Sequence, residues 1–277
     1  MFFVRDKGQL CNNILQYAHV YAWCRENHRR CMSMRFAYKY KYFRICHLPW
    51  HNFFVYSLAK LFGKLRIIPV YDYSNQINTQ PDLSQIHSPW AIVEGWTIRY
   101  YDLFLKYKRD ILNLFAFDNT IISNTKDIIC PHGYETNKDV VRIGLHVRRG
   151  DYKNFFGGRY YYDTQTYLDI IRRTIALFSG KELLVFICGN DVQVQKQIAT
   201  ELKQNDSNKA VNIVCPNGSP TEDLYVLSQC DYLVGPLSTF TVVATMYEKA
   251  KLLWIEEPQQ EIDLREFKDF NYYFRRV

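Results

Sequence analysis

The second half of the chain alternates short apolar runs with amphipathic stretches, and this alternation limits the folds available to it. The apolar runs predict strands at residues 140–148, 183–188, 211–214, 231–235 and 252–255. The stretches between them predict helices near residues 164–179, 192–203, 220–229 and 238–247. Strands that alternate with helices form parallel βαβ units. The sequence therefore predicts an α/β domain with a parallel sheet.

The first half shows a weaker form of the same pattern. We expect strands at residues 2–4, 32–36 and 65–71, and helices at residues 14–27, 50–62 and about 103–114. Residues 117–139 are polar and without clear periodicity, so we place the domain boundary there. The predicted organisation is an N-terminal domain of residues 1–139, a second domain of residues 140–257, and a tail of residues 258–277 that packs back on the first domain.

The strand predicted at residues 140–148 ends in a group of cations. Apolar and polar residues alternate along it, so His146 and Arg148 share its polar face, and Arg149 follows in a loop that Gly150 allows to turn sharply. Two guanidinium groups at a strand end can hold a diphosphate through bidentate hydrogen bonds. In open α/β sheets, ligands bind outside the carboxyl ends of strands. A solvated basic pair is the alternative interpretation of these arginines.

Two helix starts provide further polar groups. Ser238 and Thr239 lie where a predicted strand passes into a helix, and hydroxyl and N–H groups at a helix start can bind phosphate. Ser238 could equally be an ordinary helix cap. Asp223 lies near the start of the preceding helix, where its carboxylate could accept two hydrogen bonds from a guanine edge, although acids are favoured there in any helix.

Charge and cysteine content narrow the class of protein. The formal net charge of +7 favours an acidic partner, such as nucleotide phosphates, an anionic membrane surface or nucleic acid. Residues 39–44 interleave bases with aromatic residues, but no nucleic-acid-binding motif accompanies them, so we expect no nucleic-acid partner. The eight cysteines include no C-x-x-C pair, and Cys46, His47 and His51 lack a nearby fourth ligand. We therefore expect free thiols, no metal and an intracellular protein.

Four stretches resemble one enzyme family. Residues 146–152, His-Val-Arg-Arg-Gly-Asp-Tyr, resemble the H-x-R-R-G-D-Y motif of the α-1,2-fucosyltransferases of glycosyltransferase family 11. Residues 8–17 are similar to the family's G-x-x-G-N-Q-x-x-Q-Y, and residues 223–240 are similar to its D-L-x-x-M-S…S-T-F segment. A weaker match is Val-Glu-Gly-Trp at residues 93–96, followed by two tyrosines. The matches occur in the order typical of the family.

The resemblance implies a fold and a reaction. It implies an α/β structure of GT-B type, with two Rossmann-like domains and a cleft between them, the second domain binding GDP-fucose. It implies inversion at the sugar and no metal or other cofactor. By resemblance, His146 and Asp223 contact guanine, Arg148 holds the β-phosphate, Ser238 and Thr239 contact the diphosphate, and Asn12 faces the reaction centre. We also include in the predicted donor site Arg149, Asp151 and Phe240.

The acceptor side departs from the family pattern. Cys11 replaces the second glycine of the first motif, and Asn13 replaces its glutamine, so that loop could take a different path and a different acceptor. A catalytic base must reach the acceptor hydroxyl, and Asp6 and Glu94 are the candidates, although either could be a surface acid. We assign Asn13, Glu94 and Trp96 to the acceptor side.

The sequence thus predicts an enzyme that moves L-fucose from GDP-fucose to a hydroxyl of a glycan, with an α-1,2 linkage expected. We expect it in the cytoplasm, in peripheral contact with the inner face of a bacterial membrane, where it would act on a polysaccharide or lipid-linked oligosaccharide precursor. Two alternatives remain open: a glycosyltransferase with another nucleotide-sugar donor, and a non-catalytic relative that only binds a nucleotide or a sugar.

Overall fold

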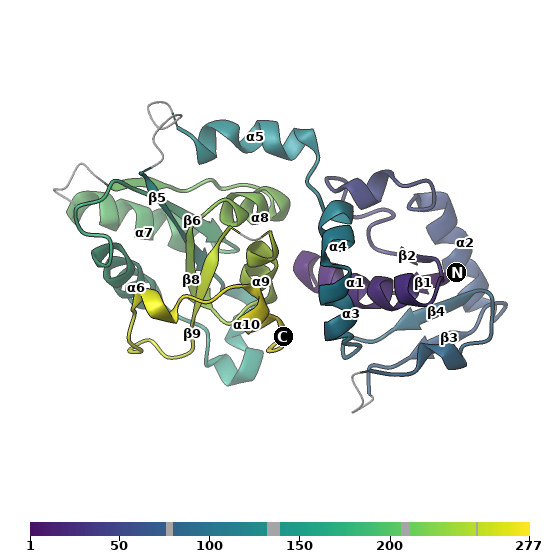
Figure 1. Cartoon of the computed structure of the whole chain (residues 1–277). Coiled ribbons are helices and arrows are strands. Elements are labelled where there is room, and N and C mark those ends of the chain that lie inside the picture. Colours follow the sequence, from purple (N-terminus) through teal and green to yellow (C-terminus); the bar gives the residue numbers. More distant parts are fainter. Residues whose placement is uncertain (76–79, 132–138, 206–210, 248) are drawn as a thin grey trace. The chain divides into compact units, whose positions relative to one another are not determined.

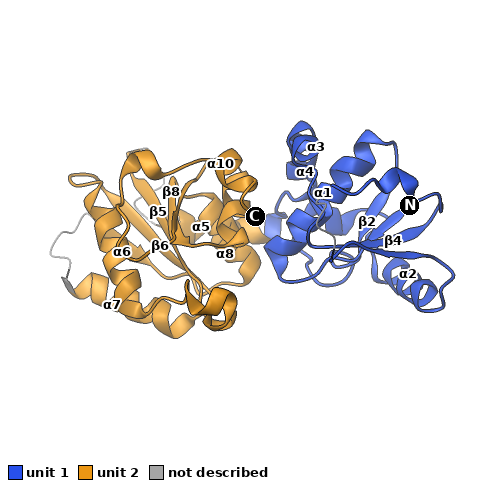
Figure 2. Ribbon diagram, turned by 90° about the horizontal axis from the view of Figure 1, so that it is seen from below, with its two compact units in different colours: residues 1–120 blue, residues 121–277 orange. Residues whose placement is uncertain are grey.

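The computed structural model describes residues 1–75, 80–131, 139–205, 211–247 and 249–277. Its contacts divide the chain into two compact units, Met1–Thr120 and Ile121–Val277 (Figure 2). The sequence places the boundary at residue 139, whereas these contacts assign the segment that starts at Ile121 to the second unit. Each unit contains its own parallel sheet.

The sheet of unit 1 consists of four described strands, β1 (Phe2–Val4), β2 (Cys31–Ser33), β3 (Val70–Asp72) and β4 (Ala91–Glu94). Their order is β2-β1-β4-β3 and all pairs are parallel. Residues of β1 and β4 are buried, since these two strands occupy the centre of the sheet. The sheet is narrow, and each strand has only three or four residues.

The helices of unit 1 are α1 (Leu10–Glu26), α2 (Phe53–Lys64), α3 (Tyr101–Lys106) and α4 (Lys108–Leu114), with 3-10 turns η1 (Arg44–His47) and η2 (Leu83–Gln85). Helix α1 begins at Leu10, ahead of the predicted residue 14. Leu10 and Cys11 are buried, so the apolar contact begins before the two asparagines, and Asn12 and Asn13 fall inside the helix.

The sheet of unit 2 confirms the predicted parallel βαβ pattern. Its described strands are β5 (Val141–Val147), β6 (Leu183–Gly189), β7 (Val211–Val214), β8 (Tyr232–Pro236) and β9 (Lys251–Ile255), in the order β7-β6-β5-β8-β9. The helices between them are α6 (Thr164–Ala176), α7 (Val192–Asn205), α8 (Pro220–Ser228) and α9 (Thr239–Met246). Figure 1 shows α6 and α7 on one side of the sheet and α8 and α9 on the other.

One helix was not predicted from the sequence, and the tail makes contacts that the sequence does not reveal. Helix α5 (Asn119–Ile129) occupies a stretch expected to be irregular, because its buried side chains, Ile121 and Thr125, repeat at a helical spacing of four. The tail makes contacts within unit 2, and its predicted packing on the N-terminal domain stays a prediction. Lys268 pairs with Leu252 of the edge strand β9. The ring of Tyr273 in α10 (Phe270–Phe274) contacts the Trp254 ring, with the centroids 4.5 Å apart and the planes tilted by 54°. The tail thereby covers the exposed edge of the sheet.

None of the described helices combines the length and the apolar character needed to cross a membrane.

Candidate active site

The strand order of unit 2 locates a binding edge. From β5 the chain proceeds through β6 to β7 on one side, and it then returns to place β8 on the other side of β5. Ligands in open α/β sheets bind at the carboxyl ends of the two strands where the order reverses. His146 and Arg148 lie at the carboxyl end of β5, and Ser238 follows β8. The structure thus brings together residues that are far apart in the sequence.

His146 is buried against the start of α9. Its ring stacks on that of Phe240 with centroids 5.0 Å apart and planes 7° from parallel. A Cβ atom at Gly235 would lie 2.7 Å from the carbonyl oxygen of His146, so glycine permits this close approach. Burial, with a smaller contribution from Arg148, lowers the pKa of His146 to about 3, so the ring is neutral. Among the described residues, none hydrogen-bonds to Nδ1.

Asp223 lies in the first turn of α8, which a capping box of Ser219 and Glu222 fixes in place. Its Oδ2 accepts a hydrogen bond from the backbone N–H of Gly189 at 3.3 Å, and in the described part of the chain its buried Oδ1 has no hydrogen-bond partner. Gly189 ends β6 and is paired with Val147 of β5, so Asp223 lies one strand away from His146. Burial raises the pKa of Asp223 to about 7.

Arg148 is connected to the start of α9 through Tyr152 of η3 (Gly150–Lys153). The guanidinium lies 5.1 Å from the centroid of the Tyr152 ring and pairs with Asp151 at 2.7 Å. The Tyr152 hydroxyl donates to the carbonyl of Leu237, the residue before Ser238. We did not single out Tyr152 from the sequence, although it is the last residue of the 146–152 motif.

Ser238 caps α9, as the alternative interpretation predicts, since its hydroxyl accepts from the N–H of Phe240 at 3.2 Å. Thr241 donates to the Ser238 carbonyl, and Trp254 donates to the Thr241 hydroxyl at 3.0 Å. These bonds fix the turn that presents Ser238 and Thr239. A capping hydroxyl still has a donor proton, so the cap does not prevent a contact with an anion.

Arg149 has different surroundings from Arg148. Its guanidinium stacks over the Tyr161 ring at 4.2 Å, donates to the hydroxyl of Tyr161 and the carbonyl of Tyr162, and pairs with Asp191 at 3.1 Å. Its backbone N–H donates to Asn190 at 2.8 Å. Arg149 thus joins the loops that follow β5 and β6. A contact of Arg149 with a ligand remains a prediction.

The strand order of unit 1 reverses between β1 and β4, and Asp6 follows β1 at this edge. Asp6 is 1% exposed, its Oδ2 accepts from the Ser33 hydroxyl, and Oδ1 has no partner among the described residues. Burial raises the pKa of Asp6 to about 8. Asn13 is also buried and donates to the Tyr40 hydroxyl at 3.1 Å, whereas within the described chain its Oδ1 lacks a partner.

The other predicted acceptor-side residues lie at or beyond the end of β4. Glu94 is buried, but its negative charge is paired with two cations, since Arg5 lies 3.2 Å and Lys7 3.6 Å from its carboxylate oxygens. The Trp96 ring carries the guanidinium of Arg99 at 4.3 Å. Asp6 therefore differs from Glu94 in having a buried carboxylate oxygen without a hydrogen-bond partner in the described chain. Within the described residues, no three His, Cys, Asp or Glu side chains gather as metal ligands.

A model of one family matches residues 1–272, and its description is Glycosyl transferase family 11. The chain belongs to glycosyltransferase family 11. This confirms the predicted enzyme class. Among curated proteins, no match is found.

Solved structures of the same fold support the GT-B-type architecture that the sequence predicts. A mutant of FUT1 from Arabidopsis thaliana in complex with GDP is similar with a TM-score of 0.61 and 15% identity, over 97% of this chain and 73% of that one. The fucosyltransferase NodZ from Bradyrhizobium is similar with a TM-score of 0.56 and 14% identity, over 94% of this chain and 96% of that one. At these identities the likeness establishes the fold.

Proposed function

We propose that this family 11 enzyme is an inverting, metal-independent fucosyltransferase that moves L-fucose from GDP-fucose to a glycan hydroxyl, forming an α-1,2 linkage. One observation carries the proposal. At the switch point of unit 2, His146 Nδ1 and Asp223 Oδ1 are buried polar atoms without hydrogen-bond partners in the described chain. They lie one strand apart, and Arg148 and the start of α9 adjoin them. Among the similar structures, FUT1 is in complex with GDP and NodZ, an α-1,6-fucosyltransferase, was soaked with GDP-fucose.

Guanine fits the polar atoms of this edge. It presents an imino and an amino donor side by side, and a carboxylate accepts from both. Adenine and cytosine each present an acceptor beside their amino group, and uracil has one donor between two acceptors, so each offers Asp223 fewer hydrogen bonds. We assign Asp223 to the guanine donors. The His146 ring is neutral and stacks on Phe240, and its Nδ1 provides a hydrogen-bonding atom for the base in addition to the Asp223 carboxylate.

The diphosphate is assigned to Arg148, Ser238, Thr239 and the amino end of α9. Breaking the bond between C1 of fucose and the β-phosphate oxygen transfers the bonding electrons to GDP. Arg148 interacts more strongly with the extra negative charge, and a group that gains strength in this way lowers the barrier. Asp151 pairs with Arg148 and so keeps the guanidinium oriented before the donor binds.

The acceptor hydroxyl attacks C1 from the face opposite the leaving group, so the configuration at C1 inverts. The hydroxyl proton must leave as the new bond forms, and we assign it to the ionised carboxylate of Asp6. A pKa of about 8 is close to neutral pH, where a base is both available and strong enough to take the proton. We assign the acceptor side to unit 1, with Asn12, Asn13, Glu94 and Trp96 as its polar and aromatic groups.

A nucleotide panel followed by a transfer assay tests the proposal. A ligand that binds only the folded state raises the melting temperature. We expect GDP to raise it more than UDP, ADP or CMP, and GDP-fucose with a glycan array to give a fucosylated product. Stronger stabilisation by UDP or ADP would favour another donor. Binding of GDP without transfer or hydrolysis of GDP-fucose would favour a non-catalytic relative.

A further inference from the structure

Unit 1 contains a pocket at the amino ends of its strands, with a cavity volume of about 600 Å³. Among the residues that line it are Met1, Arg30, Ile68 and Trp90, which lie at or just before the four strands. In a parallel sheet all amino ends share one edge. The pocket therefore lies at the opposite edge from Asp6, and the proposed transfer reaction does not use it.

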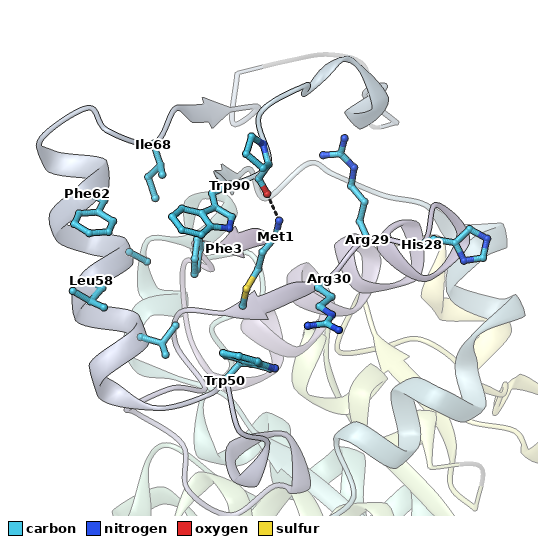
Figure 3. Close-up of a pocket in the computed structure, with 13 residues that line it drawn as sticks. Met1, Phe3, His28, Arg29, Arg30, Trp50, Leu58, Phe62, Ile68 and Trp90 are labelled. Atoms are coloured by element: carbon cyan, nitrogen blue, oxygen red, sulfur yellow. Dashed lines mark hydrogen bonds between the residues drawn. The ribbon is translucent and has the colours of Figure 1, made fainter.

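The walls of the pocket are apolar on one side and cationic on the other. Figure 3 shows Leu58 and Phe62 on α2 at one side, with Trp90 and Phe3 beside them, and His28, Arg29 and Arg30 at the other side. Arg29 lies over the Phe2 ring at 5.0 Å, whereas His28 and Arg30 are exposed. An occupant would thus meet apolar surface beside positive charge.

Helix α2 leaves much of its apolar surface exposed. Of its twelve residues, all of them described, only Ala59 is buried. Phe53 is 65% and Phe54 70% exposed, and Trp50 and Trp90 near the pocket are each more than half exposed. Of the fifteen large apolar side chains that are exposed in the described chain, eight lie between residues 50 and 90. A surface patch of this kind marks an interaction site.

The same part of the chain is strongly basic. Residues 27–71 contain nine lysines and arginines and no aspartate or glutamate. Lys60, Lys64 and Arg66 on and just after α2 are exposed. We call Trp50, residues 53–67, Trp90 and residues 28–30 together the basic apolar face.

We propose that the basic apolar face binds an anionic lipid bilayer. An interfacial helix combines exposed aromatic residues, which enter the boundary between headgroups and acyl chains, with lysines and arginines that meet lipid phosphates. A second copy of this chain would bring an identical positive face and be repelled. Nucleic acid would leave the apolar wall of the pocket uncovered. Acyl chains fill the pocket, and anionic headgroups neutralise the cationic residues at its rim.

Vesicle flotation tests this proposal with the full chain. Vesicles of phosphatidylcholine alone and of phosphatidylcholine with phosphatidylglycerol are compared at low and at physiological salt. We expect binding to the anionic vesicles and weak binding to the neutral ones. Because each exposed phenylalanine transfers its ring to the acyl region, Phe53→Ser with Phe54→Ser should weaken binding by at least about tenfold. Arg30→Gln should weaken it by about fivefold.

Phe156→Ser is the matched control, since Phe156 lies in unit 2 and its exposed fraction of 69% is close to the 70% of Phe54. We expect this variant to bind anionic vesicles as the wild type does. Circular dichroism checks that each variant is folded. Equal binding by the Phe53→Ser/Phe54→Ser variant and the wild type would overturn the proposal. The proposal would also be overturned if the wild type bound no vesicles and instead self-associated in sedimentation, and if the same double variant abolished that self-association. Neither result bears on fucose transfer, which is measured separately.

Discussion

The affinity of the enzyme for GDP should depend on pH through Asp223. In the free protein, burial raises the pKa of this carboxyl to about 7. The guanine donors require the carboxylate, so only the ionised fraction of the protein is competent to bind. That fraction is about one tenth at pH 6 and about nine tenths at pH 8, and the apparent Kd scales inversely with it. We therefore expect GDP to bind about tenfold more tightly at pH 8 than at pH 6.

Isothermal titration calorimetry of GDP at the two pH values, at constant ionic strength, measures this ratio. The phosphate of GDP also titrates in this range, so the Asp223→Asn variant is the control. An amide at this position has no charge to lose, and the pH dependence that remains in the variant belongs to the nucleotide. Removing two hydrogen bonds to a charged acceptor should also weaken binding at pH 8 by roughly 10- to 100-fold.

His146 does not complicate the experiment, because its pKa of about 3 keeps the ring neutral throughout the range. Two results would remove Asp223 from the guanine site. One is the same change in affinity between the two pH values for the wild type and Asp223→Asn. The other is GDP binding by the variant that is as tight as that of the wild type at pH 8.

Two further predictions concern stability and packing. The pKa of Asp6 is raised in the folded state to about 8, so the folded state binds this proton more tightly than the unfolded chain does, and stability falls as pH rises through the range between the two pKa values. Between pH 5 and pH 7, the free energy of unfolding measured in urea should fall by about 2 to 3 kcal/mol more for the wild type than for Asp6→Asn. If the free energies of the two proteins change with pH in parallel, the pKa of Asp6 is not raised in the folded state. In Gly235→Ala, the added Cβ would lie 2.7 Å from the His146 carbonyl oxygen, so the backbone must shift. We expect a stability loss of about 1–3 kcal/mol and weaker GDP binding in calorimetry. An unchanged Kd for GDP would show that His146 does not contact the nucleotide.

The positions of the proposed donor-side residues on the strands and helices of unit 2 were predictable from sequence, because the signals for them are local. The period-two pattern of β5 determines which face His146 occupies and where the strand ends, and the helix start at Ser238 follows from the apolar run after it. The surroundings of Arg149 could not be predicted. Its partner Asp191 follows β6, and only the pairing of β5 with β6 brings the two residues together.

Helix boundaries depended on burial that the sequence does not display. Helix α1 includes Asn12 and Asn13 because Leu10 and Cys11 already face the core, although two asparagines are typical of a turn. Only Ile121 and Thr125 of helix α5 are buried, so few core contacts mark this helix among its polar residues. The tail's position depends on long-range contacts such as Trp254 with Tyr273, which local periodicity does not reveal.

We propose that Arg148 stabilises the charge that develops on GDP as the sugar–phosphate bond breaks. Single-turnover transfer from saturating GDP-fucose measures this stabilisation. Arg148→Ala should lower the rate constant by about 10²–10³, by analogy with the loss of one oxyanion donor, and Arg148→Lys should recover little because it lacks the planar fork. Arg172→Ala, at an exposed position on α6, should retain the wild-type rate. A folded Arg148→Ala enzyme that transfers fucose as fast as the wild type would show that Arg148 does not stabilise the leaving group.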